Sequence, residues 1–81
     1  MLGSMAFKVT CTGKISGPAR AKLGEKGIKV AQGGSGASGR RYTLRPVKAK
    51  DAETAVNKAK AAVEAAGGFC SFFTASDDYS G

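Results

Sequence analysis

The sequence contains no histidine and no tryptophan, and it has only two cysteines among its 81 residues. The absence of histidine excludes Ser-His-Asp and Cys-His catalytic arrangements as well as imidazole metal sites. The two cysteines, Cys11 and Cys70, are too few and too far apart in the sequence to form a zinc site. We therefore expect no metal, no cofactor and no catalytic residues, and we predict that the protein is not an enzyme.

Long apolar segments are also missing. No run approaches the roughly 18 residues that a membrane span needs, and no basic segment followed by an apolar stretch resembles a signal peptide. These features predict a cytoplasmic protein without membrane contact, in which Cys11 and Cys70 are reduced, small apolar residues. Residues 1–4 are interpreted as a cloning remnant ahead of a natural start at Met5.

Positive charge is abundant, and it is unevenly distributed. Residues 8–50 contain eleven basic side chains and one acid, a net charge of +10, whereas residues 51–81 carry a net charge of −3. A field of this kind attracts polyanions, nucleic acid first among them, although a strongly charged surface also serves solubility.

The hydrophobic pattern predicts four strands and two helices. Apolar and polar residues alternate over 7–15, 28–32 and 41–47, and a further apolar run covers 69–74, which indicates four strands. A short helix over 18–26 is indicated by Ser16 as its cap and Pro18 in its first turn. A longer helix over 51–66 has Asp51 as its cap and Gly67 after its end. Residues 5–75 are thus predicted to form one domain, followed by a flexible acidic tail over 76–81.

This order predicts an α+β domain of the ferredoxin-like β-α-β-β-α-β type, with two helices on one face of a four-stranded sheet. The other face would be open, and the first and third strands would be central. The residues that alternate with the apolar positions would then form the floor of this open face: Lys8, Thr10, Thr12, Lys14, Arg41, Thr43 and Arg45, with Lys29 beside them.

Residues 34–39, GSGASG, match the GxGxxG pattern of dinucleotide-binding loops. That motif binds a pyrophosphate when it follows a strand and opens a helix. Here it leads into a strand, so we interpret residues 33–39 as a flexible hairpin connection whose exit is charged by Arg40 and Arg41.

The last strand contains three phenylalanines, Phe69, Phe72 and Phe73. They occupy both odd and even positions, so they cannot all face the helices. Either Phe72, or Phe69 together with Phe73, must face the open side or the solvent. An aromatic ring beside lysines and arginines on an open sheet is suited to base stacking and phosphate pairing. Burial of this ring by the tail, by Tyr79 or by a second copy of the chain is the alternative.

We therefore predict a small binding module that holds DNA or RNA with weak sequence preference, mainly through phosphates. The predicted contact residues are Lys8, Thr10, Thr12, Lys14, Lys29, Arg40, Arg41, Thr43, Arg45, Lys48 and Phe72. A different hypothesis is a protein interaction module, in which the same open face forms a homodimer or inhibits an acidic partner protein.

Residues 41–68, RYTLRPVKAKDAETAVNKAKAAVEAAGG, resemble the second half of the peptidoglycan-binding SPOR domains, which share the β-α-β-β-α-β order. The first half departs from that family, since its helix is shorter and Cys11-Thr12-Gly13 stands where those domains carry a glycine followed by an aromatic residue. The resemblance implies glycan binding as a further functional alternative.

Overall fold

The computed structural model describes residues 5–78, which form four strands and two helices. The elements follow the order β1 (Met5–Lys14), α1 (Gly17–Glu25), β2 (Lys29–Gly36), β3 (Gly39–Ala49), α2 (Ala52–Ala65) and β4 (Phe69–Asp77). The strands form one antiparallel sheet in the order β2-β3-β1-β4. The predicted α+β class, with a four-stranded sheet and two helices, is confirmed. The predicted cloning remnant and Tyr79 lie outside the described residues.

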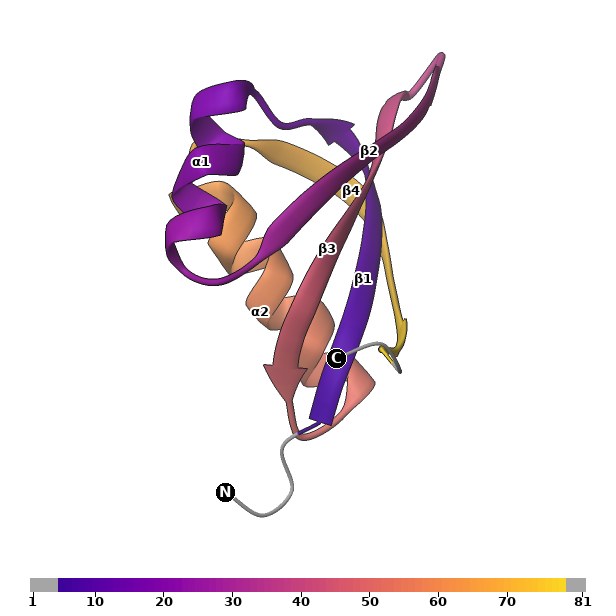
Figure 1. Ribbon diagram of the computed structural model, residues 1–81. Coiled ribbons are helices and arrows are strands. Elements are labelled where there is room, and N and C mark those ends of the chain that lie inside the picture. The colour runs from indigo at the N-terminus through magenta and orange to yellow at the C-terminus, as the bar shows by residue number, and fades with distance from the viewer. Residues whose placement is uncertain (1–4, 79–81) are drawn as a thin grey trace.

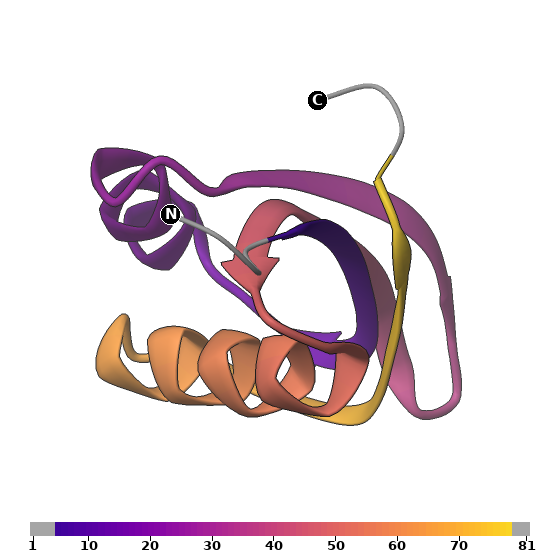
Figure 2. The same cartoon turned by 90° about the horizontal axis from the view of Figure 1, so that it is seen from below.

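Both helices lie on the same side of the sheet (Figures 1 and 2). Burial alternates along the central strands, as the sequence pattern predicts. The core side of the sheet carries Phe7, Val9 and Cys11 of β1 and Tyr42 and Leu44 of β3, and the helices cover it with Ala19, Leu23, Ala55, Ala59 and Val63. We call the other side the open face; it carries Lys8, Thr10 and Thr12 of β1 and Arg41, Thr43 and Arg45 of β3. Among residues 5–78, neither helix is long and apolar enough to cross a membrane.

The helix caps follow the sequence prediction. The Ser16 hydroxyl accepts from the backbone N–H of Ala19 at 3.3 Å, and the Asp51 carboxylate accepts from the N–H of Thr54 at 2.8 Å. Hydrogen bonds from Thr54, its side chain first and its backbone second, lower the pKa of Asp51 below its ordinary value. This carboxylate therefore serves the start of α2.

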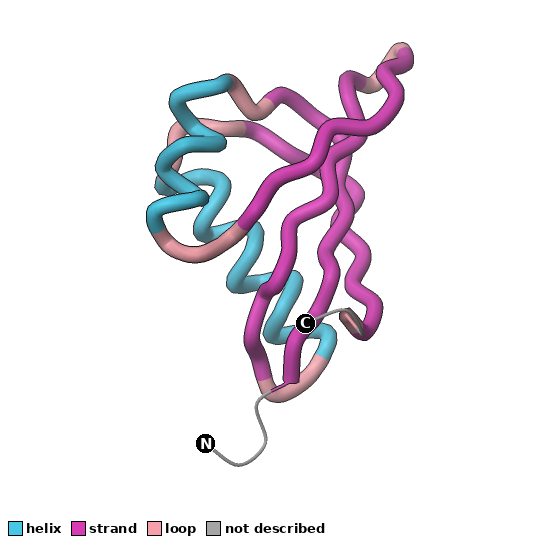
Figure 3. The backbone as a smooth tube through the Cα atoms, viewed as in Figure 1, coloured by secondary structure: helices cyan, strands magenta, loops and turns pink. Residues whose placement is uncertain are grey.

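The glycine-rich segment differs from its prediction. β2 runs on to Gly36 and β3 begins at Gly39, so the expected loop over 33–39 is a strand hairpin with a turn at residues 37–38 (Figure 3). The prediction of a hairpin connection is confirmed, but strand pairing extends further into it than the sequence predicts. Ladder pairing requires only backbone groups, which glycine supplies as other residues do. The register continues to the Ser35↔Arg40 and Gly36↔Gly39 pairs after an irregularity beyond Gln32.

The strands crowd together at the base of this hairpin. A Cβ atom on Gly39 would lie 2.8 Å from the carbonyl oxygen of Gly13, and one on Gly13 would lie 2.1 Å from that of Phe69. Gly39 also has a φ of +119°, which favours glycine. These two glycines let β3, β1 and β4 approach each other closely, just where the hairpin leaves the sheet.

Two strand ends extend beyond the predicted ranges. The ladder between β1 and β3 is irregular at Arg45 and Pro46, because a proline cannot donate a backbone hydrogen bond, yet β3 continues to Ala49. β4 continues to Asp77, two residues into the segment that the sequence assigns to a tail. The backbone N–H of Asp78 also donates to the carbonyl of Ala6, which fixes this segment against β1.

Candidate nucleic-acid interface

Threonine hydroxyls form a row across the middle of the open face. Thr10 of β1 pairs with Thr43 of β3 and with Thr74 of β4 in the sheet register. The hydroxyl oxygens of Thr10 and Thr74 are 2.6 Å apart, a hydrogen bond between neighbouring strands. This row provides polar groups that can contact a ligand without adding charge.

Lysine and arginine side chains surround the hydroxyl row. Lys8 and Lys14 lie on β1, and Arg41 of β3 is opposite Thr12. Lys29 at the start of β2 is opposite Arg45, which places it on the open face as well. The structure therefore brings most of the predicted cations to one side of the sheet.

Arg45 is paired within the chain. Its Nε donates to one carboxylate oxygen of Asp78 at 3.2 Å and its Nη2 to the other, in a bidentate ion pair. The Asp78 side chain is only 3% exposed and that of Arg45 is 36% exposed. The charge of Arg45 is thus largely neutralised, which reduces its capacity to contact a phosphate.

Arg40 is separated from the other predicted residues, whereas Lys48 lies at the far end of the open face. Arg40 is opposite Gly13, a core-side position, and it donates to the carbonyl of Gly33 at 3.1 Å. Lys48 is opposite Ala6 at the far end of β3, and its carbonyl accepts from Lys58 of α2 at 2.9 Å. The dense basic run in the sequence therefore does not form one continuous patch.

Phe72 lies in a bulge of β4. The register between β1 and β4 passes from Thr10↔Thr74 to Thr12↔Ser71, so β4 holds one residue more than β1 over this interval. Phe72 has a φ of +57°, a left-handed conformation that is rare for a bulky residue. Its side chain is 76% exposed. A left-handed conformation at a bulky residue costs free energy, and the exposed ring recovers little of it by burial.

The three phenylalanines of β4 have different surroundings. Phe73 packs against the core, whereas Phe72 borders the same hollow as Thr12 and Arg41 of the open face. Phe69 is 67% exposed and lies beside Val56 and Lys60 of α2. Neither alternative from the sequence holds as stated, because Phe69 and Phe72 are both exposed and only Phe73 packs against the core. Phe72 also borders the hollow beside α2, so it lies at the edge of the open face.

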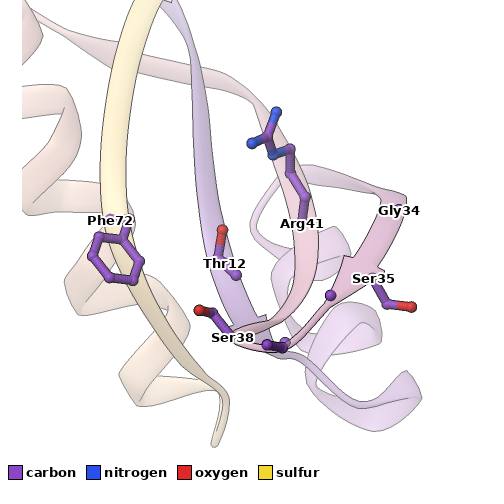
Figure 4. Close-up of a pocket in the computed structure, with 9 residues that line it drawn as sticks. Thr12, Gly34, Ser35, Ser38, Arg41 and Phe72 are labelled. Atoms are coloured by element: carbon purple, nitrogen blue, oxygen red, sulfur yellow. The ribbon is translucent and has the colours of Figure 1, made fainter.

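A hollow of about 610 Å³ lies between Phe72 and the glycine hairpin. We call it the hairpin hollow; its walls are residues 34–39, Thr12, Arg41 and Phe72. Figure 4 shows Phe72, Thr12 and Arg41 on three neighbouring strands, with Ser38 beside them on the hairpin. An aromatic ring, a guanidinium group and hydroxyls thus border one cavity.

The cysteines contradict the prediction from the sequence. Cys11 of β1 and Cys70 of β4 form a disulfide, with their Cα atoms 5.8 Å apart. They lie on adjacent antiparallel strands, near the residue pair Gly13↔Cys70, so the fold brings together two thiols that are 59 residues apart in the sequence. The prediction of two reduced cysteines, based on compartment alone, is wrong.

Sequence reasoning missed Thr74, Ser38 and Asp78 as neighbours of the interface. Thr74 and Ser38 depend on the register of β4 and on the tight hairpin turn, which no local pattern indicates. Asp78 falls in the segment predicted to be a tail, although two adjacent acids at the end of the last strand of a basic protein could have suggested an internal ion pair.

Searches of protein-family models, of curated proteins and of solved structures find no match to this chain.

Proposed function

We propose that this protein binds single-stranded nucleic acid along the open face of a ferredoxin-like sheet. The observation that carries the proposal is the exposed ring of Phe72, which a bulge of β4 holds at the edge of the face that also carries Arg41, Lys8 and Lys14. The element order and the central position of β1 and β3 support the ferredoxin-like assignment. In this role the protein acts as a non-enzymatic binding module.

A single strand fits this surface better than a duplex. An exposed aromatic ring can stack only on a base that is itself unstacked, and every base offers such a ring. Phosphates would pair with the cations outside the Arg45–Asp78 pair, namely Lys8, Lys14, Lys29 and Arg41. Because this contact involves backbone phosphates and ring faces, sequence preference is expected to be weak.

Fluorescence anisotropy with a labelled single-stranded oligonucleotide at several salt concentrations tests the proposal. With four phosphate contacts, the logarithm of affinity should fall with the logarithm of salt at a slope of about −3. Replacing Arg41 by Glu should weaken binding roughly tenfold or more and flatten this slope.

Lys22→Glu is the matched control, because it makes the same charge change on the exposed surface of α1. The proposal fails if no salt-sensitive binding occurs, or if Lys22→Glu weakens binding as much as Arg41→Glu. Light scattering is run on the same sample, since a stable dimer that covers Thr10, Thr43 and Phe72 would support the protein-interaction alternative.

Glycan binding is a second candidate, and the Cys11–Cys70 disulfide favours it. Structural disulfides persist mainly in oxidising compartments outside the cytosol, which agrees with the resemblance of residues 41–68 to SPOR domains. An aromatic ring and a row of hydroxyls also suit a sugar chain. Titration with a neutral N-acetylglucosamine oligomer distinguishes this function, since binding to an uncharged glycan should be nearly independent of salt.

A further inference from the structure

The hairpin hollow differs from the rest of the open face because it combines three kinds of chemistry. Phe72 of β4 lies on one side and Arg41 of β3 on another, with Thr12 of β1 between them, and the guanidinium group of Arg41 is directed along the sheet away from Ser38 (Figure 4). The remaining wall is the hairpin over residues 34–39, whose side chains are all hydrogen, methyl or hydroxymethyl groups. A ligand could therefore reach the hairpin backbone directly.

Two of the hairpin glycines are not explained by the fold. A Cβ atom on Gly34 or Gly36 would have no neighbour within 4 Å, and neither residue has a left-handed φ. At Gly39, by contrast, a Cβ atom would be too close to the carbonyl oxygen of Gly13 and the φ is left-handed, so the fold requires glycine there. Glycine weakens a strand, and in a strand it often marks a site where a ligand approaches closely. The open space at Gly34 and Gly36 is consistent with such a site.

Gly36 is on the side of the hairpin that borders the hollow. It is paired with Gly39, which has the same parity as Arg41 on β3, and Arg41 lies on the open face. Ser35 is paired with Arg40, which has the opposite parity. Figure 4 accordingly shows the Ser35 side chain directed away from Thr12 and Phe72.

We propose that the hairpin hollow binds one nucleotide unit of the strand, with its base stacked on Phe72 and its phosphate paired with Arg41. This inference rests on the proposed function and adds the location and size of its specific site. The hollow is open to solvent, and its volume of about 610 Å³ leaves room for one nucleotide unit on the surface. The guanidinium group can pair bidentately with a phosphate, and the Thr12 and Ser38 hydroxyls can contact the sugar or the base edge.

Gly36→Val tests this site, because it adds a branched side chain on the hollow side of the hairpin where the fold has room for it. We expect the affinity for a ten-residue oligothymidylate to fall roughly tenfold, within the range for loss of one stacked base. The melting temperature should be unchanged or higher. Gln32→Val is the matched control, since it places the same branched side chain on the same strand, opposite Tyr42 and outside the hollow, and it should leave affinity unchanged.

Titration of the wild-type protein with thymidine monophosphate, followed by NMR, provides a measurement that needs no variant. Shifts should concentrate at Thr12, Gly36, Arg41 and Phe72. If Gly36→Val binds the oligonucleotide like wild type while Arg41→Glu still weakens it, the nucleotide site is wrong and the proposed function stands. If no oligonucleotide binds at all, both fail. Nucleotide shifts confined to other residues would also overturn the site.

Discussion

The guanidinium group of Arg45 donates to both carboxylate oxygens of Asp78, and this ion pair joins β3 to the end of the described chain across the open face. Asp78 is also fixed through its backbone, which donates to Ala6 of β1 at 3.0 Å. An acid is thus held against a surface that otherwise carries cations. Its presence lowers the positive potential that a phosphate chain would meet there.

We expect Asp78→Asn to tighten oligonucleotide binding. Without the carboxylate, Arg45 becomes available for one more phosphate contact, so the salt slope should steepen by about 0.7 and affinity should rise about three- to tenfold at low salt. Glu25→Gln at the exposed end of α1 makes the same charge change away from the sheet and serves as the control. Anisotropy at several salt concentrations measures both. Equal affinity for Asp78→Asn and wild type would show that Arg45 takes no part in binding.

Local sequence patterns were sufficient to predict the elements but not the relations between them. Alternation at Val9, Cys11, Tyr42 and Leu44 predicted the buried sides of β1 and β3, because a strand with one buried side has a period of two residues. The caps at Ser16 and Asp51 followed from residues close in sequence. Such features depend on only a few neighbouring residues.

The features that shape the candidate site depend on residues far apart in the chain. The Arg45–Asp78 pair spans 33 residues and the disulfide spans 59. The bulge at Phe72 exists because β4 has one residue more than β1 between two paired threonines, which is a property of register. The position of Arg40 also depends on strand geometry. The charge pattern groups it with Arg41, but the alternation of side chains along β3 places the two on opposite sides of the sheet.

The Cys11–Cys70 disulfide should contribute strongly to stability. The two cysteines are 59 residues apart, and linking them removes conformational entropy from the unfolded chain. This should raise the free energy of unfolding by about 4 kcal/mol, which is a large part of that free energy for a small domain. We expect a dithiol reductant to lower the urea midpoint markedly. The double variant Cys11→Ala, Cys70→Ala should unfold at a similarly low midpoint.

Two measurements make this test specific. Reductant should have no effect on the double variant, which controls for actions of the reagent elsewhere. A thiol assay on the denatured, unreduced wild-type protein should detect no free thiol. Wild-type midpoints that agree with and without reductant, or free thiols in the denatured chain, would contradict a stabilising disulfide.

Phe72 should be important for binding and unfavourable for folding. Its left-handed backbone conformation costs about 1–3 kcal/mol for a residue with a side chain, and its ring, 76% exposed, recovers little of this by burial. Glycine adopts the same conformation without steric cost but loses more entropy on folding. We therefore expect Phe72→Gly to leave the free energy of unfolding unchanged or to raise it by up to about 1 kcal/mol. Oligonucleotide affinity should fall, since the stacking ring is gone.

Ser76→Gly provides the comparison, because Ser76 is an exposed residue of the same strand, paired with Lys8, and has no left-handed φ. There glycine brings only its entropic cost, so this variant should lose about 0.5–1 kcal/mol of stability and keep its affinity. Urea unfolding and anisotropy on both variants separate the two effects. If Phe72→Gly is destabilised as much as Ser76→Gly, the bulge is not strained, and if it still binds like wild type, the ring does not contact the ligand. If Phe72 is both strained and in contact with the ligand, Phe72→Gly must keep its free energy of unfolding and lose oligonucleotide affinity.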